Sequence, residues 1–387
     1  MKLGRRQFIT AAGVTGIAGL AGCSGGPSSD ATATDAGDDS NGEETDTTDG
    51  ETNTTTNVGI VYATGGLGDG SFNDQAQQGL QQAQSDFDLQ TNSLQPQEVS
   101  EFGNLQQQFA SSTDPNYDLI SGIGFLQADA LGQTATQYPD QHFQIVDSVP
   151  MRDTDDDGEG DEQYDNVASY TFREHEGSYL AGTMAGLLTL DSFSAGAGET
   201  QSDSTNLGFV GGVESSLIKK FEAGFVAGAN AVNTDIDVQT NYVGSFNDPS
   251  AGREAASSMY SSGSDIVFHA SGNTGTGVFQ AAQEAGKFAI GVDRDQSVTK
   301  SSYADVILAS MVKRVDTAVY NAIEAEVNGN FQGGATTTLG LNDNGVELVY
   351  GQQLGGDIPD SVVTEVESTR QSIIDGETDV PSDPSNV

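Results

Sequence analysis

The sequence predicts an α/β fold with two Rossmann-like lobes, each built on a parallel sheet and both facing a shared cleft. From residue 57 onward, apolar segments of strand length alternate with helical patterns, the order expected of parallel sheets with right-handed crossovers. The first strand segment, 58–63, is apolar without alternation, as expected when helices cover both faces. Four strand-to-helix turns are rich in glycine and fall into two successive sets. Because ligands of open α/β sheets bind beyond the carboxyl ends of the strands, these turns should line the cleft.

The first strand, 58–63, runs through a glycine-rich turn into a helix that opens near Asn73. The apolar stripe of this helix has spacings of three and four residues, at Ala76, Leu80, Ala83 and Phe87. Ser71 or Asn73 can cap its first N–H groups. The turn offers Phe72 and Asn73 to a ligand, although an isolated Phe is more often a core residue.

The other elements follow from the same patterns. The first set continues with a helix at 102–110, a strand at 117–122, a helix at 128–138 and a strand at 142–147. The second set has strands at 168–172, 206–212, 238–242, 265–270 and 288–292, with helices at 178–190, 216–231, 250–261 and 278–285. The last strand ends at Asp293, where an acid is either a cap or a site residue. Lys313 lies in an apolar segment expected to be helical, and a Lys that reaches to solvent is the alternative to a functional one.

Two polar insertions interrupt the pattern, at 151–165 and 191–205. The first contains Asp153, Asp155, Asp157 and Gly158, which match the first half of a calcium loop. Its twelfth position is Tyr164 instead of the required Glu. We therefore expect solvated acidic insertions and no metal site.

The charge balance excludes several partners. The chain has 57 Asp and Glu against 14 Lys and Arg, for a net charge of −43. Such a surface repels nucleic acids, and it suits a protein that works at very high salt, where screening is strong. An ordinary acidic extracellular protein is the alternative. The single cysteine, Cys23, excludes an intramolecular disulfide and a multi-cysteine metal site.

The N-terminus predicts export and lipidation. Residues 1–23 combine Arg5 and Arg6 with a mildly apolar run that ends in Leu-Ala-Gly-Cys, the pattern of a twin-arginine lipoprotein signal with Cys23 as the lipidated residue. An uncleaved anchor helix is the alternative. Residues 24–56 are acidic and polar and predict a disordered tether. The protein should therefore be exported by the twin-arginine route and held at the extracellular face of the cell membrane.

Six ordered segments resemble the basic membrane protein family of ABC-transporter substrate-binding lipoproteins. They are residues 68–80, 167–182, 208–229, 242–256, 271–296 and 309–323. The resemblance spans residue 57 to about residue 350 and implies a type I periplasmic-binding-protein fold and an ABC permease as partner. Several members of the family bind purine nucleosides. We place lobe 1 at 57–168 plus about 295–332, lobe 2 at 169–294 plus about 333–375, and a flexible tail at 376–387.

The resemblance also implies the ligand-binding residues. Phe72, Asn73 and Phe246 match aromatic segments that sandwich the base, and Gly272 matches a glycine segment of the cleft. Asp293 and Lys313 match positions that hold the ribose hydroxyls, and Asp129 corresponds to a carboxylate at the base edge. This set suits a nucleoside, because rings stack on its flat face and a carboxylate accepts from both hydroxyls of its diol.

Three functions remain open from sequence. The preferred one is a non-catalytic receptor without a cofactor that delivers a nucleoside to a permease. A nucleoside-processing enzyme is disfavoured, because the sequence has no GxSxG, HExxH or phosphate-binding GxxxxGK[ST] motif. A sensory receptor would use the same fold, and a sugar or an amine is the alternative class of ligand.

Overall fold

The computed structural model describes residues 55–155, 157–202 and 204–387. The predicted signal with Cys23 lies outside these ranges, as does the predicted tether up to residue 54. No helix in the described part of the chain is long and apolar enough to cross a membrane.

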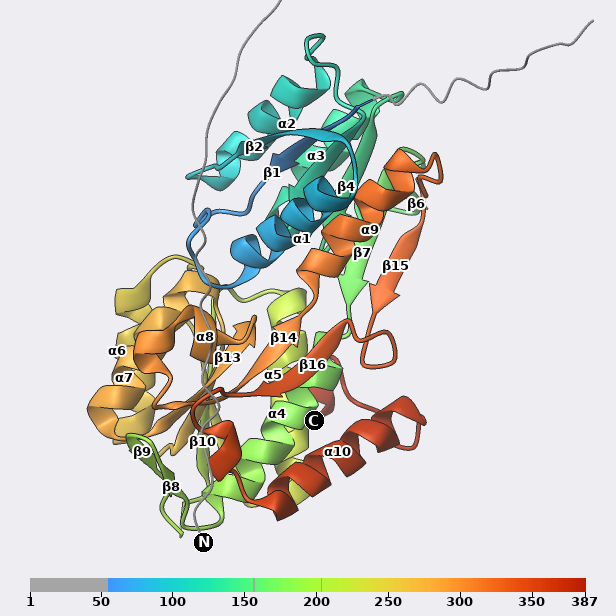
Figure 1. Cartoon of the computed structure of the whole chain (residues 1–387). Helices are drawn as coiled ribbons and strands as arrows, with labels where there is room; N and C mark the ends of the chain where they lie inside the picture. The colour runs from blue at the N-terminus through green and yellow to red at the C-terminus, as the bar shows by residue number, and fades with distance from the viewer. Residues whose placement is uncertain (1–54, 156, 203) are drawn as a thin grey trace, which may run out of the picture. The chain divides into compact units, whose positions relative to one another are not determined.

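The first lobe is built on a six-stranded sheet with the order β15-β7-β4-β3-β1-β2 (Figure 1). All its pairs are parallel. The strands are β1 (Thr56–Val61), β2 (Leu89–Leu94), β3 (Leu119–Ile123), β4 (His142–Val146), β7 (Val167–Phe172) and β15 (Thr336–Leu339). The parallel sheet confirms the predicted fold class.

The second lobe repeats this sheet, with the order β11-β10-β12-β13-β14-β16. Its strands are β10 (Asn206–Gly211), β11 (Asp237–Tyr242), β12 (Ile266–Ala270), β13 (Phe288–Asp293), β14 (Ile307–Lys313) and β16 (Val346–Tyr350). The pairs are parallel except for β16, which runs antiparallel to β14. Each strand from β10 to β14 therefore has a counterpart at the same place in the first sheet.

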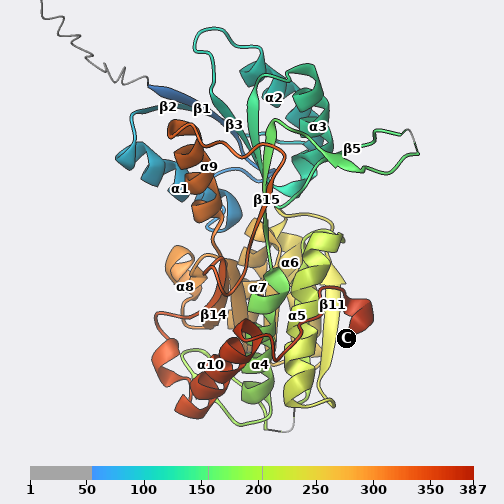
Figure 2. The same cartoon turned by 90° about the vertical axis from the view of Figure 1, so that its right-hand side faces the viewer.

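Helices cover both faces of each sheet, as the unalternating first strand predicts (Figures 1 and 2). In the first lobe, α1 (Phe72–Asp86) packs beside α9 (Val315–Val327), and α2 (Phe102–Ala110) beside α3 (Ala128–Gln137). Val58 and Ile60 of β1 belong to the core under α1 and α9, whereas Val61 belongs to the core under α2 and α3. Successive strand residues point to opposite faces, so one short apolar strand serves both cores.

The helices of the second lobe form two further pairs. They are α4 (Glu174–Thr189) with α5 (Ser216–Val232), and α6 (Pro249–Ser261) with α7 (Gly275–Ala285), while α10 (Asp360–Ile374) packs on α4. A Cβ at Gly182 would lie 2.1 Å from the carbonyl oxygen of Phe225. The backbones of α4 and α5 touch at this point, which only glycine permits.

The chain crosses between the two sheets after β7, after β14 and after β15. These crossings differ from the predicted boundaries of the lobes. β14 was expected in lobe 1, but it pairs with β13 in the second sheet, and β15 pairs with β7 in the first sheet. All of β14 is buried. It pairs with β13 on one side and with β16 on the other, so this apolar segment lies inside the second sheet. Lys313 is the last residue of β14. The expectation that it lies on a helix was therefore wrong.

The insertion at 151–165 forms a hairpin of β5 (Met151–Arg152) and β6 (Glu162–Gln163). Asp153, Asp155 and Asp157 are exposed, and one carboxylate oxygen of each lies within 4.8 Å of the others. Tyr164, at the twelfth loop position, packs against the first-lobe core. The loop therefore closes without the bidentate Glu that a calcium site requires.

The insertion at 191–205 is not the solvated segment that its composition predicts. It forms a hairpin of β8 (Ser194–Ala195) and β9 (Gly198–Glu199). Phe193, Thr200 and Ser204 are buried. Thr200 Oγ1 accepts a hydrogen bond from the backbone N–H of Phe193 at 2.9 Å.

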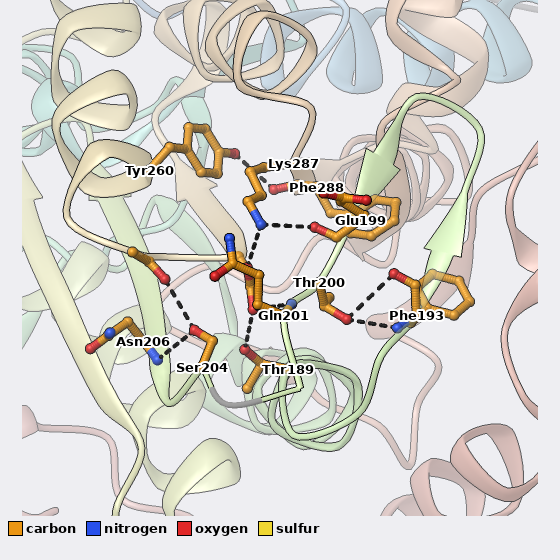
Figure 3. A network of polar contacts seen from close by, with 12 residues as sticks. Thr189, Phe193, Glu199, Thr200, Gln201, Ser204, Asn206, Tyr260, Lys287 and Phe288 are labelled. Atoms are coloured by element: carbon orange, nitrogen blue, oxygen red, sulfur yellow. Dashed lines mark hydrogen bonds and ion pairs between the residues drawn. The ribbon is translucent and has the colours of Figure 1, made fainter.

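A buried ion pair fastens this insertion to the sheet (Figure 3). Lys287 Nζ lies 2.7 Å from Asp265 Oδ1 and donates to the carbonyl of Glu199 at 3.1 Å. Asp265 Oδ2 accepts hydrogen bonds from Thr189 Oγ1 and from the backbone N–H of Gln201, both at 3.1 Å. These residues lie where β12 and β13 begin, at the end of the sheet opposite the strand-to-helix turns.

The C-terminal residues also differ from the predicted flexible tail. Val380 is buried, and Pro384–Asn386 form a short helix that packs against α5. Asp383 caps this short helix by accepting a hydrogen bond from the backbone N–H of Ser385 at 2.8 Å. One apolar side chain and one cap hold a segment whose polar composition alone predicts disorder.

Candidate ligand-binding site

A cavity lies between the carboxyl ends of the two sheets, which is where ligands of open α/β sheets bind. The first lobe contributes the turn after β1, the segment after β3, and Asp147 after β4. The second lobe contributes the start of α5, Phe246, the segment after β12, and the ends of β13 and β14. The cavity is therefore where the strand-to-helix turns were predicted to meet.

The glycine-rich turn of the first lobe is held by an acid that the sequence analysis missed. Asp69 accepts hydrogen bonds from the backbone N–H groups of Ser71, Asn73 and Asp74, at 2.8, 2.9 and 3.2 Å. The predicted caps, Ser71 and Asn73, do not cap α1 with their own side chains. Burial raises the pKa of Asp69, and the backbone hydrogen bonds oppose this shift.

Asn73 has a different task in this turn. Its Oδ1 accepts a hydrogen bond from the backbone N–H of Ala63 at 2.8 Å. Since the partner is a donor, the Asn73 side chain keeps its NH₂ group as a donor. The hydrogen bond fixes the amide beside Phe72, and both residues line the cavity.

The centre of the site is the ammonium of Lys313. Its Nζ lies 2.6 Å from Asp147 Oδ2 and 3.4 Å from Glu174 Oε1, and all three side chains are buried. The same nitrogen lies 5.1 Å from the ring centroid of Phe72 and 5.6 Å from that of Phe221, within the range of cation–π attraction. Burial disfavours the charged ammonium, but the surrounding carboxylates outweigh it and raise the pKa of Lys313.

Asp147 and Asp293 provide carboxylates from opposite lobes. Burial raises the pKa of Asp147, and the positive charge of Lys313 opposes the shift. Asp147 Oδ1 is buried and has no hydrogen-bond partner among the described residues. Asp293 Oδ2 accepts a hydrogen bond of 2.5 Å from Ser71 Oγ of the first lobe. Burial raises the pKa of Asp293 to about 6, against the influence of Lys313.

The structure brings six of the seven predicted ligand-binding residues to one cavity. They are Phe72, Asn73, Phe246, Gly272, Asp293 and Lys313. Asp129 does not line the cavity, because it lies on the exposed side of the first turn of α3. Phe125, four residues earlier, lines it instead and meets Phe246 edge to face, with ring centroids 6.2 Å apart.

Asp147 is the main residue that the sequence analysis missed, although a signal for it exists. The strand before it ends in Ile-Val-Asp, and the strand before Asp293 ends in Gly-Val-Asp. Comparison of the two strand ends would have predicted both acids. Ser271 and Asp69 also line the cavity, but neither stands out in the sequence.

The comparisons with known proteins agree with this geometry. The sequence model of a family described as ABC transporter substrate-binding protein PnrA-like, the Bmp family, matches residues 56–384. The chain belongs to this family. As a Bmp protein it is the solute-binding component of an ABC transporter, which works with membrane permease components, and is not an enzyme.

Individual relatives match most of the Bmp protein. It is 37% identical over 342 residues to the CD4+ T-cell-stimulating antigen of Listeria monocytogenes, covering 84% of this chain and 88% of that protein. It is 33% identical over 353 residues to the ABC transporter nucleoside-binding protein BmpA of Lactococcus lactis, covering 87% and 92%. The crystal structure of an ABC transporter solute-binding protein from Aeropyrum pernix superposes with a TM-score of 0.70 at 28% identity, covering 85% and 94%. These matches confirm the resemblance and the fold class that the sequence predicts.

Proposed function

We propose that this Bmp protein binds a nucleoside, preferably a purine nucleoside, in the cavity between its lobes. The observation that carries the proposal is Asp147 Oδ1, which has no hydrogen-bond partner in the described part of the chain. A buried acceptor without a partner costs about 1–3 kcal/mol, and Asp147 Oδ1 is such an acceptor beside the Lys313 ammonium. A ligand hydroxyl would satisfy this oxygen. Asp293 offers a second carboxylate to the same cavity.

The aromatic residues favour a flat ligand. Phe72 belongs to the first lobe and Phe246 to the second, and both line the cavity and are half-buried. Phe125 adds a third ring, at the contact with Phe246. Rings supplied by both lobes can enclose the faces of a heterocyclic base when the lobes close on it. The name of the Lactococcus lactis relative, a nucleoside-binding protein, supports the same class of ligand.

We also propose that the protein acts at the extracellular face of the cell membrane, where a lipid on Cys23 holds it near its permease. The twin arginines Arg5 and Arg6 and the Leu-Ala-Gly-Cys sequence support this. Replacement of Cys23 by Ala should move the protein from the membrane fraction to the medium. Replacement of both arginines by Lys should leave it inside the cell. Equal membrane association of Cys23→Ala and wild type would overturn the anchor.

Calorimetric titration in multimolar KCl tests the ligand. The panel is adenosine, guanosine, inosine, uridine, ribose and glucose, and we expect heat with the purine nucleosides. If folded protein gives heat with sugars only, the ligand is a sugar and not a nucleoside, and the role in the transporter is unchanged. Prolonged incubation with inosine should give no free base, as expected of a receptor.

A further inference from the structure

Ser271 is the cavity-lining member of a series of three buried, hydrogen-bonded side chains in the second lobe. It follows β12 directly, lines the cavity and is 1% exposed. Its Oγ lies 3.2 Å from His269 Nδ1, and His269 Nε2 lies 2.9 Å from Gln296 Oε1. His269 and Gln296 are fully buried. The hydrogen bonds fix the positions of all three side chains, of which only Ser271 lines the cavity.

The hydrogen bonds of Gln296 determine which atoms donate and which accept in the bonds among Ser271, His269 and Gln296. The backbone N–H of Val292 donates to Gln296 Oε1 at 2.9 Å, so the atom at that position must be the amide oxygen. Since an oxygen of this kind only accepts, His269 Nε2 must carry a hydrogen to bond with it. A neutral imidazole with its hydrogen on Nε2 has Nδ1 as an acceptor.

The imidazole is neutral at ordinary pH. Burial lowers the pKa of His269 to about 4, and this exceeds the opposite influence of the hydrogen bond with Gln296. The positive charge of Lys300 lowers the pKa further. Nδ1 therefore keeps its lone pair.

Ser271 must then donate its only hydroxyl hydrogen to His269 Nδ1. What remains on Ser271 Oγ is acceptor capacity. Ser271 follows β12 and Asp293 ends β13, and these two parallel strands are neighbours in the second sheet. Ser271 and Asp293 therefore both line the cavity at the same end of the second sheet.

We propose that Ser271 is a specificity-determining acceptor of this site and that His269 is its positioning residue. Ser271 then selects ligands that present an N–H or O–H donor to it. It disfavours ligands that present an acceptor, such as a carbonyl or an ether oxygen, at the same point. The proposal deepens the proposed function, because it requires a ligand in this cavity.

The first test measures the tautomer without any ligand. The chain has only three histidines, so ¹⁵N spectra of histidine-labelled protein are simple, and His142→Gln and His175→Gln assign the other two. We expect His269 to carry its hydrogen on Nε2 from neutral pH down to about pH 4. In Ser271→Ala the signal of His269 Nδ1 should shift, because its donor is lost. A hydrogen on Nδ1 in the wild type would overturn the proposal whether or not nucleosides bind.

The second test identifies the ligand group that donates to Ser271, by measuring how Ser271→Ala changes the affinity for each of several analogues. Adenosine is compared with its 2′-deoxy, 3′-deoxy, 5′-deoxy and N6-dimethyl analogues, and ribose with its deoxy forms if only sugars bind. Ser271→Ala should weaken binding of the parent ligand about two- to tenfold. For the one analogue that lacks the matching donor, the mutation should have no further effect. Unchanged binding, or an equal loss for every ligand, would overturn the proposal.

His269→Leu separates positioning from simple packing. Without Nδ1 the Ser271 hydroxyl is free to rotate and can donate to a ligand. The ratio of affinities for the parent and the matched analogue should therefore fall toward one, while Ser271→Thr should keep the wild-type ratio. A ratio within one variant does not depend on its stability. A wild-type ratio in His269→Leu would show that His269 does not set the direction of the bond.

Discussion

Asp147 and Asp293 occupy the same place in the two lobes. Asp147 follows β4 and Asp293 ends β13, the corresponding strand of the second sheet. Both have a left-handed backbone, with φ of 70° and 64°, which is rare for residues other than glycine and most tolerated by Asp and Asn. The repeated turn points two carboxylates into one cavity, where Lys313 interacts with both.

Loss of the Asp293 carboxylate should weaken ligand binding. Hydrogen bonds to a charged group contribute about 1.5–3 kcal/mol, so we expect Asp293→Ala to raise the dissociation constant of a purine nucleoside about tenfold or more. Asp129→Ala is the matched control, because Asp129 is an exposed carboxylate outside the cavity. Calorimetry on both variants checks this. A larger loss in the control would return Asp129 to the site.

Nucleoside affinity should depend on pH through Asp293. Burial raises the pKa of this carboxyl from 3.8 to about 6, and ligand hydroxyls favour its ionised form. The dissociation constant should therefore fall between pH 5 and pH 7 and level off above it. In Asp293→Asn this dependence should be reduced. Calorimetry at several pH values measures both, and equal slopes in the two proteins would contradict the assignment.

The contribution of Asp293 to the stability of the ligand-free protein should fall as the pH rises, whereas the nucleoside affinity should rise. A carboxyl whose pKa is higher in the folded state stabilises the fold below its unfolded pKa of about 4, and this is lost as pH rises through 6. Asp293→Asn should therefore gain stability over the wild type more at pH 7 than at pH 4. Urea unfolding at fixed KCl concentration measures the difference. A gain that is the same at both pH values would show that Asp293 titrates normally.

Removal of the Lys313 charge should destabilise the fold. Lys313→Met leaves Asp147 and Glu174 buried without the ammonium that both contact, and breaking a buried pair costs about 3–5 kcal/mol. Lys219→Met is the control, because its pair with Glu214 is on the surface and should not change the unfolding midpoint. If both variants unfold at the same urea concentration as the wild type, the Lys313 cluster is not structural.

Lys287→Met should separate stability from binding. Lys287 is buried against Asp265 at the far end of the second sheet (Figure 3), and it does not line the cavity. We expect a loss of stability of about 3–5 kcal/mol with an unchanged nucleoside dissociation constant under folding conditions. A changed dissociation constant would mean that the insertion at 191–205 influences the cleft.

The net charge of −43 predicts a strong dependence on salt. Self-repulsion of the folded chain is relieved as the Debye length falls to about 3 Å at 1 M salt. The thermal midpoint should therefore rise between 0.2 M and 3 M KCl. Ligand affinity in the folded protein should change much less, because the site is buried. A midpoint that is independent of KCl would contradict the high-salt interpretation.

Some of the fold could be read from local patterns and some could not. Most central strands have an apolar, buried middle, as in β1 and β13, and were predicted closely. The buried strand β14 is an exception, because its segment was predicted to be helical. β2 (LQTNSL) and β15 (TTTL) were missed, because both are largely polar edge strands with exposed residues. Their pairing depends on neighbouring strands far away in sequence, so composition alone does not reveal it.

The sequence by itself determined most of the buried strands and the residues that follow them. An apolar run and a glycine-rich turn are local features, and together with the family resemblance they single out Phe72, Asn73 and Asp293. Only the tertiary structure decided that β14 closes the second sheet, that Asp147 meets Lys313, and that Asp129 points to solvent. Those outcomes depend on contacts such as the 2.6 Å pair of Lys313 with Asp147, whose partners are 166 residues apart. Contacts of that kind arise from packing two lobes together, and no local spacing encodes them.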